Sequence, residues 1–193
     1  MMRSGFADPV FDAQAVFRGV QDALARPGLP QSVAPPGSAE GLSPAAAAIL
    51  LCLTDYTTPV WLAHGNEHPA ASWLAFHTGA RTTTKAKDAQ FAVLALGAAA
   101  PLLRDFAAGE DCYPDRSATL IVECRDFIYG TRVRLSGPGI RDTVDITPTG
   151  PRPGFWAEMA ANAARFPLGV DVFLTAGNAM IGLPRSSTIR EIA

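Results

Sequence analysis

The sequence lacks the features of several protein classes. Its 193 residues include only two lysines, Lys85 and Lys87, and three widely spaced cysteines without a CxxC pair. This cysteine pattern indicates neither a zinc ribbon nor a disulfide framework and favours a reducing compartment. The apolar runs are shorter than the roughly 20 residues of a membrane-spanning helix, and Asp8 and Asp12 interrupt the region where an export signal would be apolar. We therefore expect a cytoplasmic protein with no membrane segment.

The chain also lacks a large excess of charge of either sign. Sixteen Lys and Arg residues face eighteen Asp and Glu residues, which leaves a formal charge of −2. This balance gives no electrostatic basis for binding nucleic acid or an anionic membrane. Fourteen of the cationic residues are arginine. Arginine suits phosphate and phosphonate oxygens, although a GC-rich genome produces the same enrichment, so any anion binding is expected to be local.

The pattern of hydrophobic residues predicts one globular α/β domain over residues 1–193. Helices are expected at 9–25, 44–53, 69–77, 102–107 and 155–166, and strands at 59–63, 91–96, 118–124, 131–136, 170–175 and 180–183. The strands at 118–124 and 131–136 are predicted to form a hairpin, as are the last two strands. Helices alternate with strands in the first half and antiparallel pairs follow, so we expect a mixed β-sheet covered by helices on both faces.

Two of the predicted helices have distinct apolar patterns. In the first, the apolar residues recur at spacings of three and four, which predicts a core-facing stripe of Val10, Ala13, Phe17, Val20 and Leu24. The helix at 44–53 is apolar on nearly all sides and follows Ser43, a good N-cap residue. We therefore expect this second helix to lie buried between layers.

A candidate metal motif occurs after the strand at 59–63. The string His64-Gly65-Asn66-Glu67-His68 matches the H-x-x-E-H motif of inverted zinc proteases. That chemistry requires a helix so that both imidazoles face one metal, whereas Gly65 and Asn66 are typical of a turn. We expect a polar loop and no metal site.

A candidate anion site occurs at Arg134 and the following turn, Gly137-Pro138-Gly139. Consecutive backbone N–H groups in a glycine turn can hold an anion, and the arginine would add a fork of hydrogen bonds. A tight turn that leaves a strand explains the same residues. Both explanations remain open at this point.

Two further residues are candidates for ligand contact. His77 lies at a helix end, where it is either a general acid or base or a C-terminal cap favoured by the helix dipole. Arg185 follows the last strand of an α/β sheet, at an edge where ligands often bind, or belongs to a solvated tail. Together with the candidates above, these residues form no complete catalytic group.

Several strings occur in a specific order over almost the whole chain. They are Phe11–Arg18 with Pro27-Gly28, Thr58–Leu62, Phe76–Thr78, Arg134–Ile140, Phe166–Asp171 and Leu183–Arg185. Their order and spacing resemble those of the PhnH family, which supplies a subunit of the bacterial carbon-phosphorus lyase system for phosphonate use. The length of the chain is also similar to that of the family.

The resemblance implies a non-autonomous subunit that works with PhnG, PhnI and PhnJ and forms a homodimer in isolation. The system transfers the ribose triphosphate moiety of ATP to an alkylphosphonate, which gives ribose 1-methylphosphonate 5-triphosphate and releases adenine. The family fold is similar to the large domain of transferases that depend on pyridoxal phosphate (PLP), but without the cofactor site. Only Lys85 and Lys87 could form a Schiff base, and both lie in an expected polar loop, so no cofactor is predicted.

Two functional hypotheses follow. In the first, the chain is an interaction subunit whose surfaces complete a site made mostly by other subunits. In the alternative, it is a phosphonate- or nucleotide-binding enzyme subunit with its own anion site at Arg134 and the Gly137–Gly139 turn.

Overall fold

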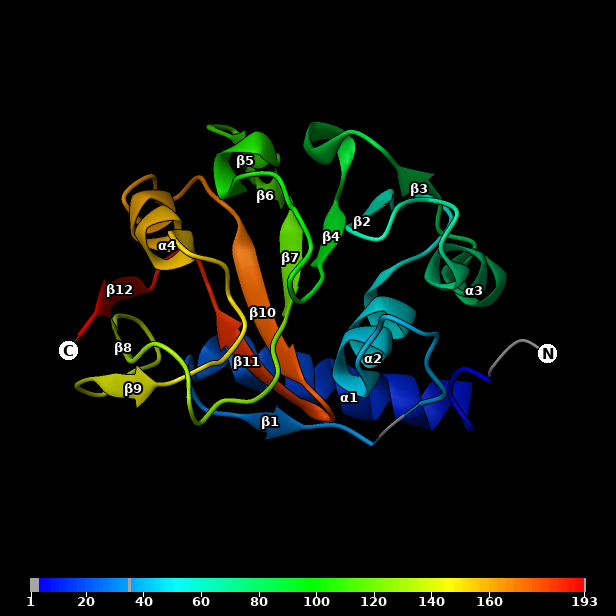
Figure 1. Cartoon of the computed structure of the whole chain (residues 1–193), viewed down its shortest axis with the longest axis horizontal. Coiled ribbons are helices and arrows are strands. Elements are labelled where there is room, and N and C mark those ends of the chain that lie inside the picture. Colours follow the sequence, from blue (N-terminus) through cyan, green and yellow to red (C-terminus); the bar gives the residue numbers. More distant parts are fainter. Residues whose placement is uncertain (1–3, 35, 193) are drawn as a thin grey trace.

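A computed structural model describes residues 4–34 and 36–192 and arranges them around one large β-sheet (Figure 1). The helices are α1 (Pro9–Ala25), α2 (Pro44–Leu53), α3 (Pro69–Thr78) and α4 (Phe155–Ala163), with short 3-10 helices η1 (Ala86–Asp88) and η2 (Leu103–Asp105). The strands are β1 (Gln31–Ser32), β2 (Val60–Leu62), β3 (Thr82–Thr83), β4 (Phe91–Leu94), β5 (Ala108–Glu110), β6 (Tyr113–Ser117), β7 (Thr119–Glu123), β8 (Val133–Ser136), β9 (Val144–Ile146), β10 (Asp171–Ala176), β11 (Ala179–Leu183) and β12 (Thr188–Glu191). Within the described part of the chain, no helix combines the length and hydrophobicity needed to cross a membrane.

The main sheet has seven strands in the order β1-β11-β10-β7-β4-β2-β3. The strands from β10 to β3 are parallel to their neighbours, whereas β11 is antiparallel to both β10 and β1. In the centre, Leu120 of β7 lies between Ala92 of β4 and Val172 of β10. The predicted mixed sheet is therefore confirmed, and the carboxyl ends of β2, β4, β7 and β10 lie along one edge.

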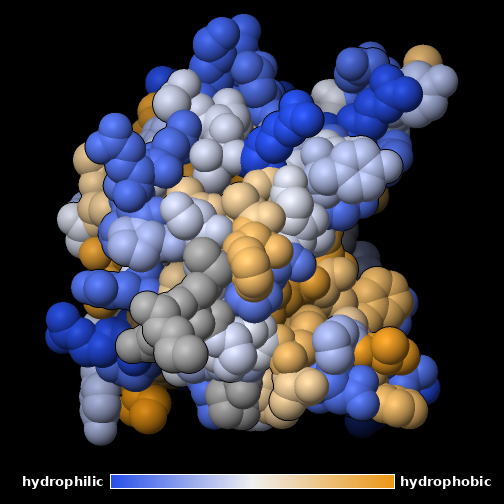
Figure 2. All heavy atoms as spheres, turned by 90° about the vertical axis from the view of Figure 1, so that its right-hand side faces the viewer, coloured by the Kyte–Doolittle hydropathy of each residue, from blue (hydrophilic) through white to orange (hydrophobic). Residues whose placement is uncertain are grey.

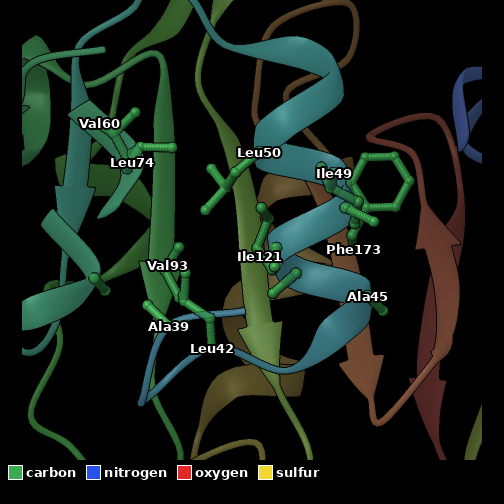
Figure 3. Close-up of a cluster of buried hydrophobic side chains, with 14 of the residues drawn as sticks. Ala39, Leu42, Ala45, Ile49, Leu50, Val60, Leu74, Val93, Ile121 and Phe173 are labelled. Atoms are coloured by element: carbon green, nitrogen blue, oxygen red, sulfur yellow. The ribbon is translucent and has the colours of Figure 1, made fainter. Parts of the chain in front are cut away.

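Helix α2 lies on one face of this sheet together with α1 and α3. Its start is fixed by Ser43, whose Oγ accepts a hydrogen bond from a backbone N–H in the first turn at 3.2 Å. Ile49 and Leu50 are fully buried, and Figure 3 shows them beside Ile121 and Phe173 of the sheet. Burying each side chain of this size contributes about 1.5–3 kcal/mol. The prediction that this helix is buried is confirmed.

The predicted core stripe of α1 is only partly right. Val16, Val20 and Ala23 are the buried residues of this helix, whereas Val10 is 74% exposed and Phe17 is 46% exposed. The stripe that faces the core is therefore rotated from the predicted one. Residues three and four apart occur on several neighbouring stripes of one helix. Apolar residues on the outer face, such as Val10 and Phe17, therefore moved the predicted stripe away from the one that is buried.

The other face of the sheet is covered by α4 and by a second sheet with the strand order β12-β8-β9. Figure 1 shows this layer to the left of the main sheet and α2 and α3 to its right. In β8, Val133 and Leu135 are buried while Arg134 is exposed, because side chains alternate between the two faces of a strand. The expectation of a sheet covered on both faces is confirmed, with a small sheet beside the helix on the second face.

The predicted hairpin of strands 118–124 and 131–136 is wrong. Strand β7 lies between β4 and β10 in the main sheet, whereas β8 pairs with β9 and β12. The connection turns at Asp126, whose Oδ1 accepts hydrogen bonds from the backbone N–H groups of Ile128 and Tyr129 at 2.9 and 3.1 Å. Two strands joined by a short polar loop have the same sequence pattern whether they pair with each other or cross between sheets.

Two helix predictions also differ from the structure. Residues 102–107 contain only the turn η2, after which β5 pairs with β6 in a separate two-stranded sheet. Helix α4 ends at Ala163, although the prediction extended it to Phe166. Pro167 disfavours a helical conformation in the residue before it, which explains an end earlier than the apolar pattern indicates.

Candidate functional site

The carboxyl ends of parallel strands are where α/β sheets bind ligands, at the point where the strand order reverses. In this sheet β3 lies on one side of β2 and the next strand of the chain, β4, lies on the other side, so the strand order reverses at β2. Two hollows of about 300 Å³ each lie at this edge. The α4-side hollow is lined by Leu94, Ala95, Val122, Glu123, Arg152 and Phe155, and the α2-side hollow by Ser43, His64, Ala95, Leu96, Glu123 and Cys124, among others. Ala95 and Glu123 therefore line both.

Glu123, the last residue of β7, lines both hollows, and its buried carboxyl group lies on the α2 face of the sheet. Its Oε1 accepts a hydrogen bond from the backbone N–H of Ser43 at 2.8 Å, and its Oε2 accepts one from Thr175 Oγ1 at 3.0 Å. Burial raises the pKa of this carboxyl, and the hydrogen bonds from Ser43 and Thr175 oppose that effect. Glu123 therefore connects the ends of β7 and β10 with the start of α2.

The start of α2 has its N–H groups already paired. Ser43 donates to Glu123, Ala45 donates to the carbonyl oxygen of Gly177 at 3.0 Å, and Ala46 donates to Ser43 Oγ at 3.2 Å. A helix N-terminus at this edge is the usual position for a phosphate in α/β proteins. In this chain the Glu123 carboxyl group occupies that position.

The α4-side hollow has mainly apolar walls and no excess of positive charge. Leu94, Val122 and Phe155 contribute buried apolar side chains. Arg152 is the only cationic residue among the described residues that line this hollow. Its Nη1 and Nη2 atoms contact the two carboxylate oxygens of Glu158 at 2.7 and 2.9 Å, so its charge is neutralised locally. Its Nε atom is buried and has no hydrogen-bond partner in the described part of the chain.

The α2-side hollow contains His64 and Cys124. The His64 ring lies 4.4 Å from that of His68, centroid to centroid, and burial followed by the effect of His68 lowers the pKa of His64. His68 in turn caps α3, because its Nδ1 accepts a hydrogen bond from Ala70 N–H at 3.2 Å. The H-x-x-E-H string thus lies in a turn, as predicted, and the described residues contain no group of three potential metal ligands. Burial is the main effect that raises the pKa of the Cys124 thiol to about 12.

The residues predicted to bind an anion lie outside these hollows. Arg134 donates from Nε and Nη2 to the two carboxylate oxygens of Asp145 at 2.7 and 2.9 Å. Gly137 and Gly139 have φ values of +129° and +81°, and a Cβ at Gly139 would lie 2.1 Å from the carbonyl oxygen of Ala25. These contacts support the explanation that the turn serves packing. The anion site stays a prediction.

Arg185 and His77 lie on different elements, and neither is shown in contact with Arg134. The backbone just after Arg185 lies beside the turn, since a Cβ at Gly137 would be 3.1 Å from the carbonyl oxygen of Ser186. Arg185 donates to the Asp171 carboxylate, to Ser117 Oγ and, at 2.7 Å, to the carbonyl oxygen of Pro114. It is therefore neither part of a solvated tail nor near the hollows: β11 is antiparallel to β10, so its end lies beside the start of the parallel strands. His77 lies in the last turn of α3, with its ring 4.9 Å from that of Trp73. The structure thus directs the Arg185 side chain to partners of its own and places His77 on α3, so the predicted site residues do not form one site.

No motif in the sequence singles out Glu123, although a signal is present. Glu123 follows the run Leu120-Ile121-Val122, which predicts a buried strand. A charged residue that continues such a run is an exception, because buried acidic residues are rare unless paired. Its partners Ser43 and Thr175 are 80 and 52 positions away, so no local pattern identifies them.

Comparisons with known proteins agree with the resemblance. A family model described as "Bacterial phosphonate metabolism protein (PhnH)" matches residues 4–190. The chain is 43% identical over 191 residues to "Alpha-D-ribose 1-methylphosphonate 5-triphosphate synthase subunit PhnH" of Rhizobium meliloti (strain 1021), which covers 96% of this chain and 94% of that protein. It is also 37% identical over 76 residues, 39% of each chain, to "Putative C-P lyase subunit protein HtxG" of Stutzerimonas stutzeri. The chain therefore belongs to the PhnH family of bacterial phosphonate metabolism proteins.

Proposed function

We propose that this chain is a non-autonomous cytoplasmic subunit of a ribose 1-methylphosphonate 5-triphosphate synthase in phosphonate catabolism. In the proposed reaction, the ribose triphosphate moiety of ATP is transferred to an alkylphosphonate and adenine is released. The observation that carries the proposal is the 43% identity, over 96% of the chain, to a protein named as a subunit of that synthase. The proposed partners are PhnG, PhnI and PhnJ, with a homodimer for the isolated chain.

The main candidate polar groups already have partners within the chain, which supports a role that depends on other subunits. Glu123 accepts hydrogen bonds from two other elements, Arg134 is paired with Asp145, and Arg185 is paired with Asp171. Each of these groups would have to leave bonds that hold the fold in order to act on a substrate. The simplest account is that companion subunits contribute the reacting groups and that this chain shapes part of the site.

The outer face of α1 supports the same proposal. Val10, Phe11 and Phe17 are 74%, 70% and 46% exposed, and Val10 and Phe17 are seven residues apart on one stripe. Figure 2 shows hydrophobic side chains gathered in the lower half of the side that carries the N-terminal end of α1. Clustered apolar surface is typical of a protein interface. We take the occupant of this face to be a companion subunit, because the full-length relative is named as a subunit of a larger enzyme.

Co-expression with tagged PhnG, PhnI and PhnJ tests the proposal. We expect the wild-type chain to co-purify with them, and the double variant Phe11→Ser, Phe17→Ser to be lost from the complex while its melting temperature changes little. Phe166→Ser is the control, because Phe166 is 62% exposed but lies outside α1. Failure of the wild-type chain to associate contradicts the proposal. Loss of a homodimer only, with the complex intact, assigns the face to a second copy instead.

The alternative function, an anion site of the chain's own, has one observation in its favour. Arg132 and Arg134 both pair with the single carboxylate of Asp145, and the exposed Arg190 lies opposite Arg134 on β12. This surface therefore has an excess of positive charge. The alternative predicts that Arg134→Ala weakens the binding of ATP or methylphosphonate without unfolding the chain. Unchanged affinity in calorimetry removes this site from consideration.

We further propose that the fold is similar to the large domain of PLP-dependent transferases and that the chain binds no PLP. The mixed sheet of seven strands between two layers supports the likeness. Lys85 and Lys87 are exposed around η1 and do not lie in an apolar pocket of the kind that activates a Schiff-base lysine. Incubation with PLP is expected to give no absorbance band of an internal aldimine, and a band abolished by one lysine substitution contradicts this.

A further inference from the structure

A smaller hollow lies between η2 and α4, separate from the α4-side and α2-side hollows. Its volume is about 120 Å³, and this η2–α4 hollow is lined by Leu102, Leu103, Arg104, Glu158, Ala161 and Arg165, among others. Sites for drug-sized ligands measure about 300–1,000 Å³. The η2–α4 hollow therefore has room for one small chemical group and not for a whole nucleotide.

The two arginines of this hollow are exposed and have no partner within the chain. Neither Arg104 nor Arg165 forms an ion pair or a side-chain hydrogen bond among residues 4–34 and 36–192. The carboxylate that lines the same hollow, Glu158, is already engaged. Its two oxygens contact Arg152 at 2.7 and 2.9 Å, and one of them accepts a hydrogen bond from Leu103 N–H at 2.8 Å. The lining therefore has two positive charges that its own carboxylate does not offset.

The backbone that carries Arg104 is held in place on both sides. The bond from Leu103 N–H to Glu158 attaches η2 to α4, and the Leu103 side chain is buried. The Asp105 carboxylate accepts a hydrogen bond from Leu102 N–H at 2.9 Å, which closes the turn. Arg104 thus projects from a fixed turn, so the approach of its guanidinium group to a ligand orders only the side chain.

The backbone that carries Arg165 is fixed as well. Its N–H donates to the carbonyl oxygen of Asn162 at 3.0 Å. The Asn162 side chain is buried and bonds both the N–H and the carbonyl oxygen of Val170, at 2.8 and 2.9 Å. The segment after α4 is therefore tied to the start of β10, and the two arginines border one hollow from two rigid elements.

Two guanidinium groups beside apolar surface suit an oxyanion that carries a small apolar group. Each arginine can donate two parallel hydrogen bonds to phosphate-type oxygens. Leu103 and Ala161 add apolar surface to the lining. An alkylphosphonate has oxygens enough for two arginine forks and a short alkyl group for the apolar surface. A phosphate group presents similar oxygens, whereas a planar carboxylate suits one fork.

We propose that the η2–α4 hollow binds one phosphonate or phosphate group through the guanidinium groups of Arg104 and Arg165. Both are binding residues, and no chemical step is assigned to them. The inference rests on the proposed function only for the source of the group, which is either the alkylphosphonate or the nucleotide. The site is distinct from the alternative anion site at Arg134, whose guanidinium group is paired with Asp145.

Titration of the purified full-length chain, followed by phosphorus NMR, tests this proposal. The probes are methylphosphonate, inorganic phosphate and ATP. We expect methylphosphonate and phosphate to bind with dissociation constants within about fivefold of each other, because two arginines recognise the oxygens they share. ATP that binds more than about tenfold more tightly than methylphosphonate assigns the site to a nucleotide phosphate, and weaker ATP binding assigns it to the phosphonate. Absence of binding by both methylphosphonate and phosphate overturns the proposal.

Arginine variants locate the bound group. Arg104→Ala and Arg165→Ala should each weaken methylphosphonate binding at least about tenfold, because each loses charge-assisted hydrogen bonds. Arg104→Lys should lose less than Arg104→Ala, because the charge stays and only the fork is lost. Arg81→Ala is the control, since Arg81 is exposed and does not line this hollow. Wild-type affinity in both Arg104→Ala and Arg165→Ala overturns the assignment.

Two glutamate variants of α4 form a matched pair. Ala160 and Ala161 are both exposed, and of the two only Ala161 lines the hollow. Ala161→Glu places a carboxylate beside Arg165, where it competes with the ligand, and should abolish methylphosphonate binding. Ala160→Glu adds the same charge outside the hollow and should bind as wild type does. Glutamate is a good helix former, so both variants should melt close to wild type. Equal affinities of the two variants contradict the proposed site.

The two proposals fail in different ways. If the chain co-purifies with PhnG, PhnI and PhnJ but binds neither methylphosphonate nor phosphate, only the oxyanion site is wrong. If it binds methylphosphonate through Arg104 and Arg165 but never joins the other subunits, the oxyanion site stands and the role in the synthase is wrong.

Discussion

The backbone N–H of Ser43 donates a hydrogen bond to Oε1 of Glu123 at 2.8 Å, which joins the start of α2 to the end of β7. Through Oε2, the same carboxyl group accepts from Thr175 at the end of β10. One side chain thus holds three elements together at the edge where the two hollows lie. The stability of this edge is therefore expected to depend on Glu123.

Glu123→Ala should destabilise the chain. Removing the carboxyl group leaves the part-buried Ser43 N–H and the buried Thr175 hydroxyl without this acceptor, which costs about 1–3 kcal/mol. Glu123→Gln, which keeps an amide oxygen, should lose less. Urea unfolding followed by circular dichroism measures both, and the exposed Glu67→Gln is the control. Equal stability of Glu123→Ala and wild type would show that the hydrogen bonds contribute nothing.

The pH dependence of stability should report on Glu123. Burial raises the pKa of this carboxyl above its usual value of 4.5, so the folded state holds a proton that the unfolded state releases as pH rises. The contribution of Glu123 to stability therefore falls as pH increases from about 4.5 toward the raised pKa. The difference between wild type and Glu123→Gln in unfolding free energy, measured at several pH values, should decrease across this range. A difference that grows with pH contradicts the raised pKa.

The cysteines should differ sharply in reactivity. The pKa of the buried Cys124 thiol is about 12, so almost no thiolate forms at pH 8, whereas Cys112 is exposed. Iodoacetamide at pH 8 should modify Cys112 in the folded chain and Cys124 only after unfolding in urea. Mass spectrometry of peptides identifies the sites, with Cys112→Ser as the control. Rapid modification of Cys124 in the folded chain would contradict its burial.

Gly139→Ala should be much more damaging than Gly177→Ala. Both glycines have positive φ, which costs another residue about 1–2 kcal/mol. At Gly139 the added Cβ would also lie 2.1 Å from the carbonyl oxygen of Ala25, whereas nothing lies within 4 Å of a Cβ at Gly177. Thermal unfolding of both variants measures the difference. Similar melting temperatures would remove packing against α1 as the reason for the Gly137–Gly139 turn.

Much of the fold could be predicted where local chemistry determines the element. Ser43 and the apolar run after it define α2, and the turn at Gly177-Asn178 joins the hairpin of β10 and β11. The pairing of strands that are distant in the sequence is harder to predict. The sequence contains both β7 and β8, but which sheet each joins depends on contacts with β4, β10 and β12 that local spacing does not encode.

The candidate site was less predictable than the fold for the same reason. Arg134 and Arg185 stand out in the sequence because arginine is typical of anion sites, yet Asp145 and Asp171 pair with them only in the folded chain. Glu123 becomes a site residue only when the parallel strands place it beside the start of α2. The sequence predicts which residue types are present, whereas their pairing partners come from the tertiary structure.

Reconstitution of the synthase tests the central claim most directly. PhnG, PhnI and PhnJ would be incubated with ATP and methylphosphonate, with and without this chain, and adenine release would be followed by chromatography. We expect adenine and ribose 1-methylphosphonate 5-triphosphate to form only when all the subunits are present, and this chain alone to give none. Product formation by the purified chain on its own, abolished by one substitution within it, would contradict the account.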